Sequence, residues 1–68
     1  MAMFPKSKTF TEEEIEKLIE YISINENARN VTYIGQTNFN VKFQGIKDSQ
    51  RIFFNIDKNS GTIIEETE

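Results

Sequence analysis

The sequence predicts an α+β fold in which one N-terminal helix packs on a four-stranded antiparallel β-meander, in two layers. Three observations support this prediction. A capping sequence at Thr11 opens an apolar stripe with helical spacing. From Val31 onward, apolar and polar residues alternate with a period of two. Short segments rich in Gly, Asn, Asp and Ser separate the expected strands, so consecutive strands should pair as antiparallel neighbours.

The length of 68 residues allows one domain, which we expect over residues 10–66, between an extended arm at 1–9 and an acidic tail at 67–68. So short a chain buries only about 60% of the surface that its unfolded form exposes. Small domains often gain stability from disulfides, metals or oligomerisation, and this chain has no Cys and no His. A homodimer and an unusually well-packed core are the two alternatives left.

The helix start carries the clearest local signal. Thr11 as N-cap and Glu14 three residues later fit a capping box, and Phe10 and Ile15 have the spacing of a hydrophobic staple. The stripe that follows has the i, i+3, i+4, i+7 spacing of an amphipathic helix and is formed by Ile15, Leu18, Ile19 and Ile22. We expect the helix to end near Ile24.

Alternation predicts the strands, which we place at residues 31–34, 38–44, 51–57 and 62–66, with turns at 35–38 and 57–61 and a loop at 45–50. The side chains expected to face the helix are Val31, Tyr33, Phe39, Val41, Phe43, Ile52, Phe54 and Ile56. The last strand has two possible registers, because either Ile63 or Ile64 can face the core.

The residues that most enzymes need are missing. Without His or Cys the usual triads cannot form, and the three glycines are isolated, so there is no phosphate-binding loop. Asp57, Asn59 and Glu68 match positions 1, 3 and 12 of an EF-hand loop, but Gly61 is at position 5, where the motif needs it at 6. We therefore expect no enzymatic activity, no cofactor and no metal site.

No segment approaches the roughly 20 apolar residues of a membrane span, and the N-terminus has no signal-peptide pattern. These observations predict a cytoplasmic protein without membrane contact. The bias toward Ile, Asn and Lys, whose codons are AT-rich, indicates a low-GC bacterium or one of its mobile elements, such as a phage.

Two surfaces are candidates for binding a partner. On the sheet face turned away from the helix, Phe53 should lie beside Ile34, and an apolar pair on a polar face is typical of an interface. The predicted contact residues there are Ile34, Lys42, Arg51 and Phe53. On the helix, an acidic face formed by Glu13, Glu16 and Glu20 is either solvated or mimics nucleic acid.

Direct nucleic-acid binding is disfavoured. Lysines and phenylalanines are interleaved along the strands, but alternation puts only Phe53 on the same face as Lys42 and Arg51. The formal net charge of −3 also disfavours contact with phosphates.

The helix followed by strands that end in Ile56-Asp57-Lys58-Asn59-Ser60-Gly61-Thr62-Ile63-Ile64 resembles one PepSY-type repeat. Repeats of that family often close with a strand, an Asp, a turn Gly and a final apolar strand. The family's members are commonly secreted or membrane-linked and are thought to inhibit or regulate peptidases. The resemblance implies a binding or inhibitory role and transfers no functional residue.

We therefore expect a small non-enzymatic protein-binding module that inhibits or regulates a partner protein. Small acidic domains of phages often antagonise host defence systems, which gives one setting for such a role. The alternative is a domain that binds a small ligand or nucleic acid with the outer sheet face.

Overall fold

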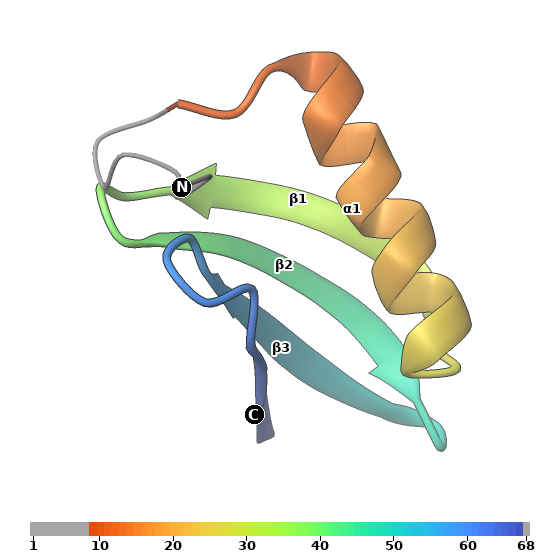
Figure 1. Cartoon of the computed structure of the whole chain (residues 1–68). Coiled ribbons are helices and arrows are strands. Elements are labelled where there is room, and N and C mark those ends of the chain that lie inside the picture. The colour runs from red at the N-terminus through yellow and green to blue at the C-terminus, as the bar shows by residue number, and fades with distance from the viewer. Residues whose placement is uncertain (1–8, 68) are drawn as a thin grey trace.

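The computed structural model describes residues 9–67. Helix α1 (Glu12–Asn25) is followed by strands β1 (Arg29–Gln36), β2 (Asn40–Lys47), β3 (Gln50–Asp57) and β4 (Ile63–Thr67). The strands form one antiparallel sheet in the order β1-β2-β3-β4, and α1 lies on one face of it (Figure 1). The predicted α+β meander is confirmed. The predicted arm, apart from Thr9, and Glu68 of the predicted tail lie outside the described residues, and Thr67 belongs to β4.

The helix begins as predicted. The backbone N–H of Glu14 donates to Thr11 Oγ1 at 3.2 Å, and the N–H of Thr11 donates to Glu14 Oε1 at 2.9 Å. Both halves of the capping box are therefore formed. At the other end Asn27 has φ of 54°, a left-handed conformation that Asn tolerates better than most residues. The chain then turns directly into β1.

The core lies between α1 and the central strands. Its buried side chains are Ile15, Ile22, Ala28, Val41, Phe43, Ile52, Phe54 and Ile56. The rings of Tyr33 and Phe43 meet edge to face, with centroids 5.8 Å apart. Burial thus follows the predicted helical stripe on one side and the predicted alternation of β2 and β3 on the other.

Phe39 is a correction to the predicted core, because it is 57% exposed. It belongs to the turn between β1 and β2, where Thr37 Oγ1 accepts from the N–H groups of Phe39 and Asn40 at 3.2 and 3.1 Å. Strand β2 starts at Asn40, so its first inward side chain is Val41. The prediction extended the alternation of β2 back into the turn, and it therefore wrongly placed Phe39 in the core.

The predicted loop at 45–50 is also wrong. Strand β2 continues to Lys47 and β3 starts at Gln50, so the connection is a two-residue turn. Asp48 and Ser49 have φ of 54° and 66°, the positive angles of a type I′ hairpin turn. Gly45 lies inside β2, where a Cβ atom would be 3.2 Å from the Arg29 carbonyl oxygen and 3.2 Å from Val31 Cγ2. This glycine permits close packing and does not mark a loop.

The edge strands also differ from the predicted boundaries. Strand β1 runs from Arg29 to Gln36, longer than predicted, and its pairing with β2 is irregular at two places. Strand β4 pairs Ile63 with Ile56 and Ile64 with Asn55. Ile63 is therefore on the helix side and partly buried, whereas Ile64 points away and is 53% exposed. This resolves the register that the sequence left open.

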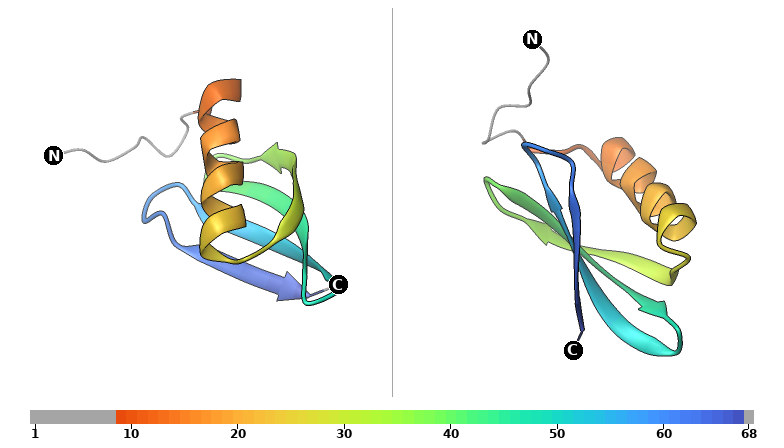
Figure 2. Two further views of the ribbon diagram at one scale, coloured as in Figure 1. Left: turned by 90° about the vertical axis from the view of Figure 1, so that its right-hand side faces the viewer. Right: turned by 60° about the horizontal axis from the view of Figure 1, so that its bottom comes forward.

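The second face of the sheet is the feature that positions the candidate site. Helix α1 stays on one side of the sheet in both further views, and no described segment crosses the opposite side (Figure 2). Within residues 9–67 no helix is long and apolar enough to cross a membrane.

Candidate binding face of the sheet

We call the sheet surface turned away from α1 the outer face. The strand pairing places its side chains in rows across the sheet. One row contains Lys42, Asn55 and Ile64, with Ile34 beside it; the next contains Thr32, Gln44, Phe53 and Glu66; a third contains Ile46 and Arg51.

Phe53 is near the middle of the outer face and is half-buried by its neighbours. It forms one wall of a hollow of about 230 Å³, with the side chains of Ile34, Lys42, Asn55 and Glu66 around it. Three of the four residues predicted on this face therefore converge on one hollow. The hollow combines an apolar wall with one basic and one acidic side chain.

Arg51, the fourth predicted residue of the outer face, lines a neighbouring hollow of about 210 Å³. It shares this hollow with Thr32, Gln44 and Ile46. Since Gln44 pairs directly with Phe53, the two hollows adjoin. The four predicted residues thus lie on one continuous face.

The outer face also carries polar groups without partners. Asn55 Oδ1 is buried and accepts no hydrogen bond within the described part of the chain. Leaving a buried acceptor unpaired costs about 1–3 kcal/mol. Lys42 and Glu66 form no ion pair within residues 9–67. The ammonium group of Lys42 and the carboxylate of Glu66 are therefore available around Phe53.

The acidic residues predicted as a second contact surface lie elsewhere. Glu13, Glu16 and Glu20 are exposed on α1, in the other layer of the fold. They are not brought together with the outer face, so a flat partner surface that covers Phe53 cannot also contact them. The sequence therefore predicted two separate surfaces.

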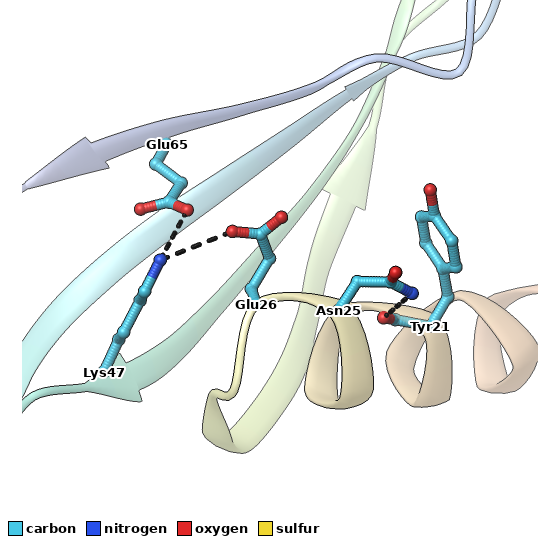
Figure 3. A network of polar contacts seen from close by, with 5 residues as sticks. All are labelled: Tyr21, Asn25, Glu26, Lys47 and Glu65. Carbon is cyan, nitrogen blue, oxygen red and sulfur yellow. Dashed lines mark hydrogen bonds and ion pairs between the residues drawn. The ribbon is translucent and has the colours of Figure 1, made fainter.

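A polar cluster that sequence reasoning missed lies on the helix side (Figure 3). Lys47 Nζ lies 2.8 Å from Glu65 Oε2 and 3.4 Å from Glu26 Oε1. It thus joins β2 to β4 and to the residue that caps α1. Alternation continued from Val41 would have placed Lys47 on this side, but the predicted loop at 45–50 hid that signal.

The contacts within the cluster shift the pKa values of Glu26, Lys47 and Glu65. Hydrogen bonding to Glu65, together with burial, raises the pKa of Glu26 above its ordinary value. Hydrogen bonding to Glu26, and then to Lys47, lowers the pKa of Glu65. The hydrogen bond to Glu65 is the main reason that the pKa of Lys47 is raised. Because these contacts tie three elements together, we assign the cluster to stability and not to binding.

A larger groove, of about 510 Å³, opens beside the helix. Its apolar lining comes mainly from Phe10, Leu18, Tyr21 and Ile56, with Lys17 and Lys58 also in its wall. The Lys58 ammonium lies 5.5 Å from the centre of the Phe10 ring. None of the predicted binding residues lines this groove.

Comparison with known proteins adds no relative. No family model matches the chain, and neither a curated protein nor a solved structure matches it. The resemblance to a PepSY-type repeat therefore stays a prediction.

Proposed function

We propose that this protein is a small non-enzymatic protein-binding module that inhibits or regulates a partner protein through its outer face. The observation that carries the proposal is the apolar surface of Phe53, Ile34 and Ile64 on a sheet face that no described segment covers. Ile34 and Ile64 are 49% and 53% exposed. An open face of an antiparallel sheet is normally polar, so these side chains need another reason to be there.

The chemistry of the face fits protein recognition. Interfaces concentrate their binding energy in a few central aromatic or arginine side chains within a more polar rim. Here Phe53 is central, and Lys42, Glu66 and Arg51 surround it. Charges of both signs around the centre select the partner and its orientation more than they add affinity.

The distribution of acidic groups supports a role without catalysis. An acid or base that works in catalysis usually has a shifted pKa and lies in a cleft. Two carboxyl groups with shifted pKa values, Glu26 and Glu65, are both bound by Lys47 in the cluster that joins the elements. Their shifts thus have a structural cause.

The test is a tagged pull-down from the source organism or its host, with wild type and Phe53→Asp as parallel baits. We expect one stoichiometric partner that Phe53→Asp loses. Ile24→Asp is the matched control, because Ile24 is 77% exposed on α1 and the change in charge and polarity is the same. Circular dichroism must confirm that both variants are folded. A partner that Phe53→Asp retains would exclude the outer face as the contact surface.

The same experiment addresses the proposed setting and the second surface. If the protein antagonises a host defence system, the captured partner is a host protein. A triple change of Glu13, Glu16 and Glu20 to Lys should leave capture unchanged, since these residues lie on the other layer. Loss of capture with the triple variant would assign binding to the acidic helix face instead.

A second candidate function is small-ligand binding, which the groove beside α1 favours. Its volume of about 510 Å³ is within the range of small-molecule sites, about 300–1,000 Å³. A thermal-shift screen would test it, with Leu18→Gln as the variant that adds a polar group to the groove wall. Stabilisation by a compound in wild type but not in Leu18→Gln would support this function.

A further inference from the structure

We infer that the groove beside α1 binds small amphipathic carboxylates, in which an apolar tail ends in a single negative charge. The inference rests on the second candidate function, small-ligand binding, and names the chemical class of the ligand. It is independent of the outer face, because no residue that lines the hollow around Phe53 also lines this groove.

Three parts of the fold form the groove. Helix α1 contributes Lys17, Leu18 and Tyr21, and the turn between β3 and β4 contributes residues from the range 57–61. Phe10 lines it from the segment that leads into the helix. Ile56, which is buried in the core, lines it from the sheet.

Two of these parts are fixed by hydrogen bonds of the chain itself. Gln36 Oε1 accepts from the N–H of Phe10 at 3.0 Å, and Gln36 Nε2 donates to the Phe10 carbonyl oxygen at 3.3 Å. In the turn, Asp57 Oδ1 accepts from the N–H groups of Asn59 and Ser60 at 2.7 and 3.1 Å. The groove is therefore formed before a ligand arrives, which lowers the free-energy cost of binding.

The apolar side chains of the groove suit a hydrocarbon tail. Tyr21 is 46% exposed, and Phe10 and Leu18 are only partly buried against the core. A tail that lies along these side chains removes their apolar surface from water, which is the main favourable contribution to binding.

The charges of the groove select an anion. Lys17 and Lys58 both line it, although the whole chain has a net charge of −3. Among the described residues that line the groove, Asp57 is the only acid, and its Oδ1 is engaged by the turn. The glutamates of α1 do not line the groove. Lys58 is 4% exposed, so water and salt screen its charge less than that of a surface lysine.

The head group has a specific place beside α1. Lys17 and Tyr21 are four residues apart on the helix, so their side chains are neighbours. Within residues 9–67, Lys17 has no ion pair, and the Tyr21 hydroxyl has no hydrogen bond. Only the Tyr21 carbonyl oxygen is engaged, by Asn25 (Figure 3). An ammonium and a hydroxyl group can both donate to one carboxylate.

A cationic ligand does not fit the same groove. The aromatic rings of Phe10 and Tyr21 could attract a cation. However, the Lys58 ammonium already lies 5.5 Å from the centre of the Phe10 ring. A cationic ligand there would lie close to like charges.

The test is an amide chemical-shift titration of the full chain with three probes that share one tail: octanoate, n-octanol and n-octylammonium. We expect octanoate to shift the amide signals around Leu18 and in the turn at 57–61, with a Kd on the order of 1 mM. Binding of n-octanol should be about fivefold weaker, because it lacks the charge that pairs with Lys17. Binding of n-octylammonium should be weaker still.

Two variants test the position of the head group. Lys17→Gln should weaken octanoate about fivefold and leave n-octanol unchanged, which a general loss of structure would not do. Tyr21→Phe removes only the hydroxyl and should weaken octanoate about threefold. Lys42→Gln is the matched control, because it removes an exposed lysine that does not line the groove.

The outcomes separate this inference from both candidate functions. Equal affinity for the three probes, or a Lys17→Gln variant that binds octanoate like wild type, overturns the inference but leaves small-ligand binding in place. Octanoate that shifts no signal of the groove also overturns it. In that case, a compound from the thermal-shift screen that stabilises wild type but not Leu18→Gln would still support the second candidate function. The pull-down with Phe53→Asp tests the outer face independently of each result.

Discussion

Phe43 and Phe39 offer a direct test of which strand residues form the core. Both lie at positions that simple alternation assigns to the helix side, yet Phe43 is fully buried and Phe39 is 57% exposed. Replacement of a buried Phe by Ala removes its transfer free energy and leaves a cavity, which together cost about 3–5 kcal/mol. A chain of 68 residues is stable by about 3–10 kcal/mol in total.

Phe43→Ala should therefore unfold much of the protein at room temperature, and Phe43→Leu is the graded variant, with an expected loss of about 1–2 kcal/mol. Phe39→Ala should cost about 1 kcal/mol or less, because less than half of that side chain is buried and no enclosed cavity forms. The assay is urea unfolding followed by far-ultraviolet circular dichroism, at low micromolar protein. If Phe39→Ala costs as much as Phe43→Ala, the boundary between the β1–β2 turn and β2 is misplaced.

Three further predictions concern the cluster at Lys47 and the β2–β3 hairpin. The folded-state pKa of Lys47 is raised above its ordinary 10.5. The ion pairs of Lys47 therefore make their full contribution to the free energy of unfolding below pH 10.5. The difference in unfolding free energy between wild type and Lys47→Met should thus shrink as pH rises above 10.5; a constant difference in urea midpoints would contradict the ion pairs. Gly45→Val should lower stability by about 1–3 kcal/mol through overpacking, while Gly35→Val, with nothing within 4 Å of its Cβ position, should not overpack; equal losses of melting temperature would refute the close contact. Changing Asp48 and Ser49 together to Asn-Gly should stabilise by about 1 kcal/mol, since both have positive φ; a lower melting temperature would exclude the type I′ turn.

Features that depend on neighbours in the chain were predicted correctly. The capping box at Thr11 and the stripe from Ile15 to Ile22 need only spacings of three and four residues, and both are present. The inward positions of β2 and β3 follow from alternation within one strand. These patterns involve residues only a few positions apart, so they can be recognised in a single sequence.

Features decided by distant contacts were not predictable in the same way. Gly45 favoured a loop in the sequence, but a glycine is needed there because Arg29 and Phe54 of the neighbouring strands approach its backbone closely. The register of β4 was open because Ile63 and Ile64 are equally apolar, and only pairing with β3 distinguishes them. On the candidate face, alternation alone could assign Ile34, Lys42 and Phe53 to one side, whereas Glu66 enters the hollow only through the pairing of β3 with β4.

The irregular pairing of β1 has a consequence for how this protein can assemble. A straight outermost strand exposes a row of free N–H and C=O groups, which invites another strand to add to the sheet and so to start an open fibre. In β1 the two register irregularities, together with the positive φ of Asn30, break that row. At the opposite border, the carboxylate of Glu66 lies on β4 and repels a like strand. Both edges of the sheet thus disfavour strand addition. We therefore expect this chain to bind other molecules through a face of the sheet and not through its edges.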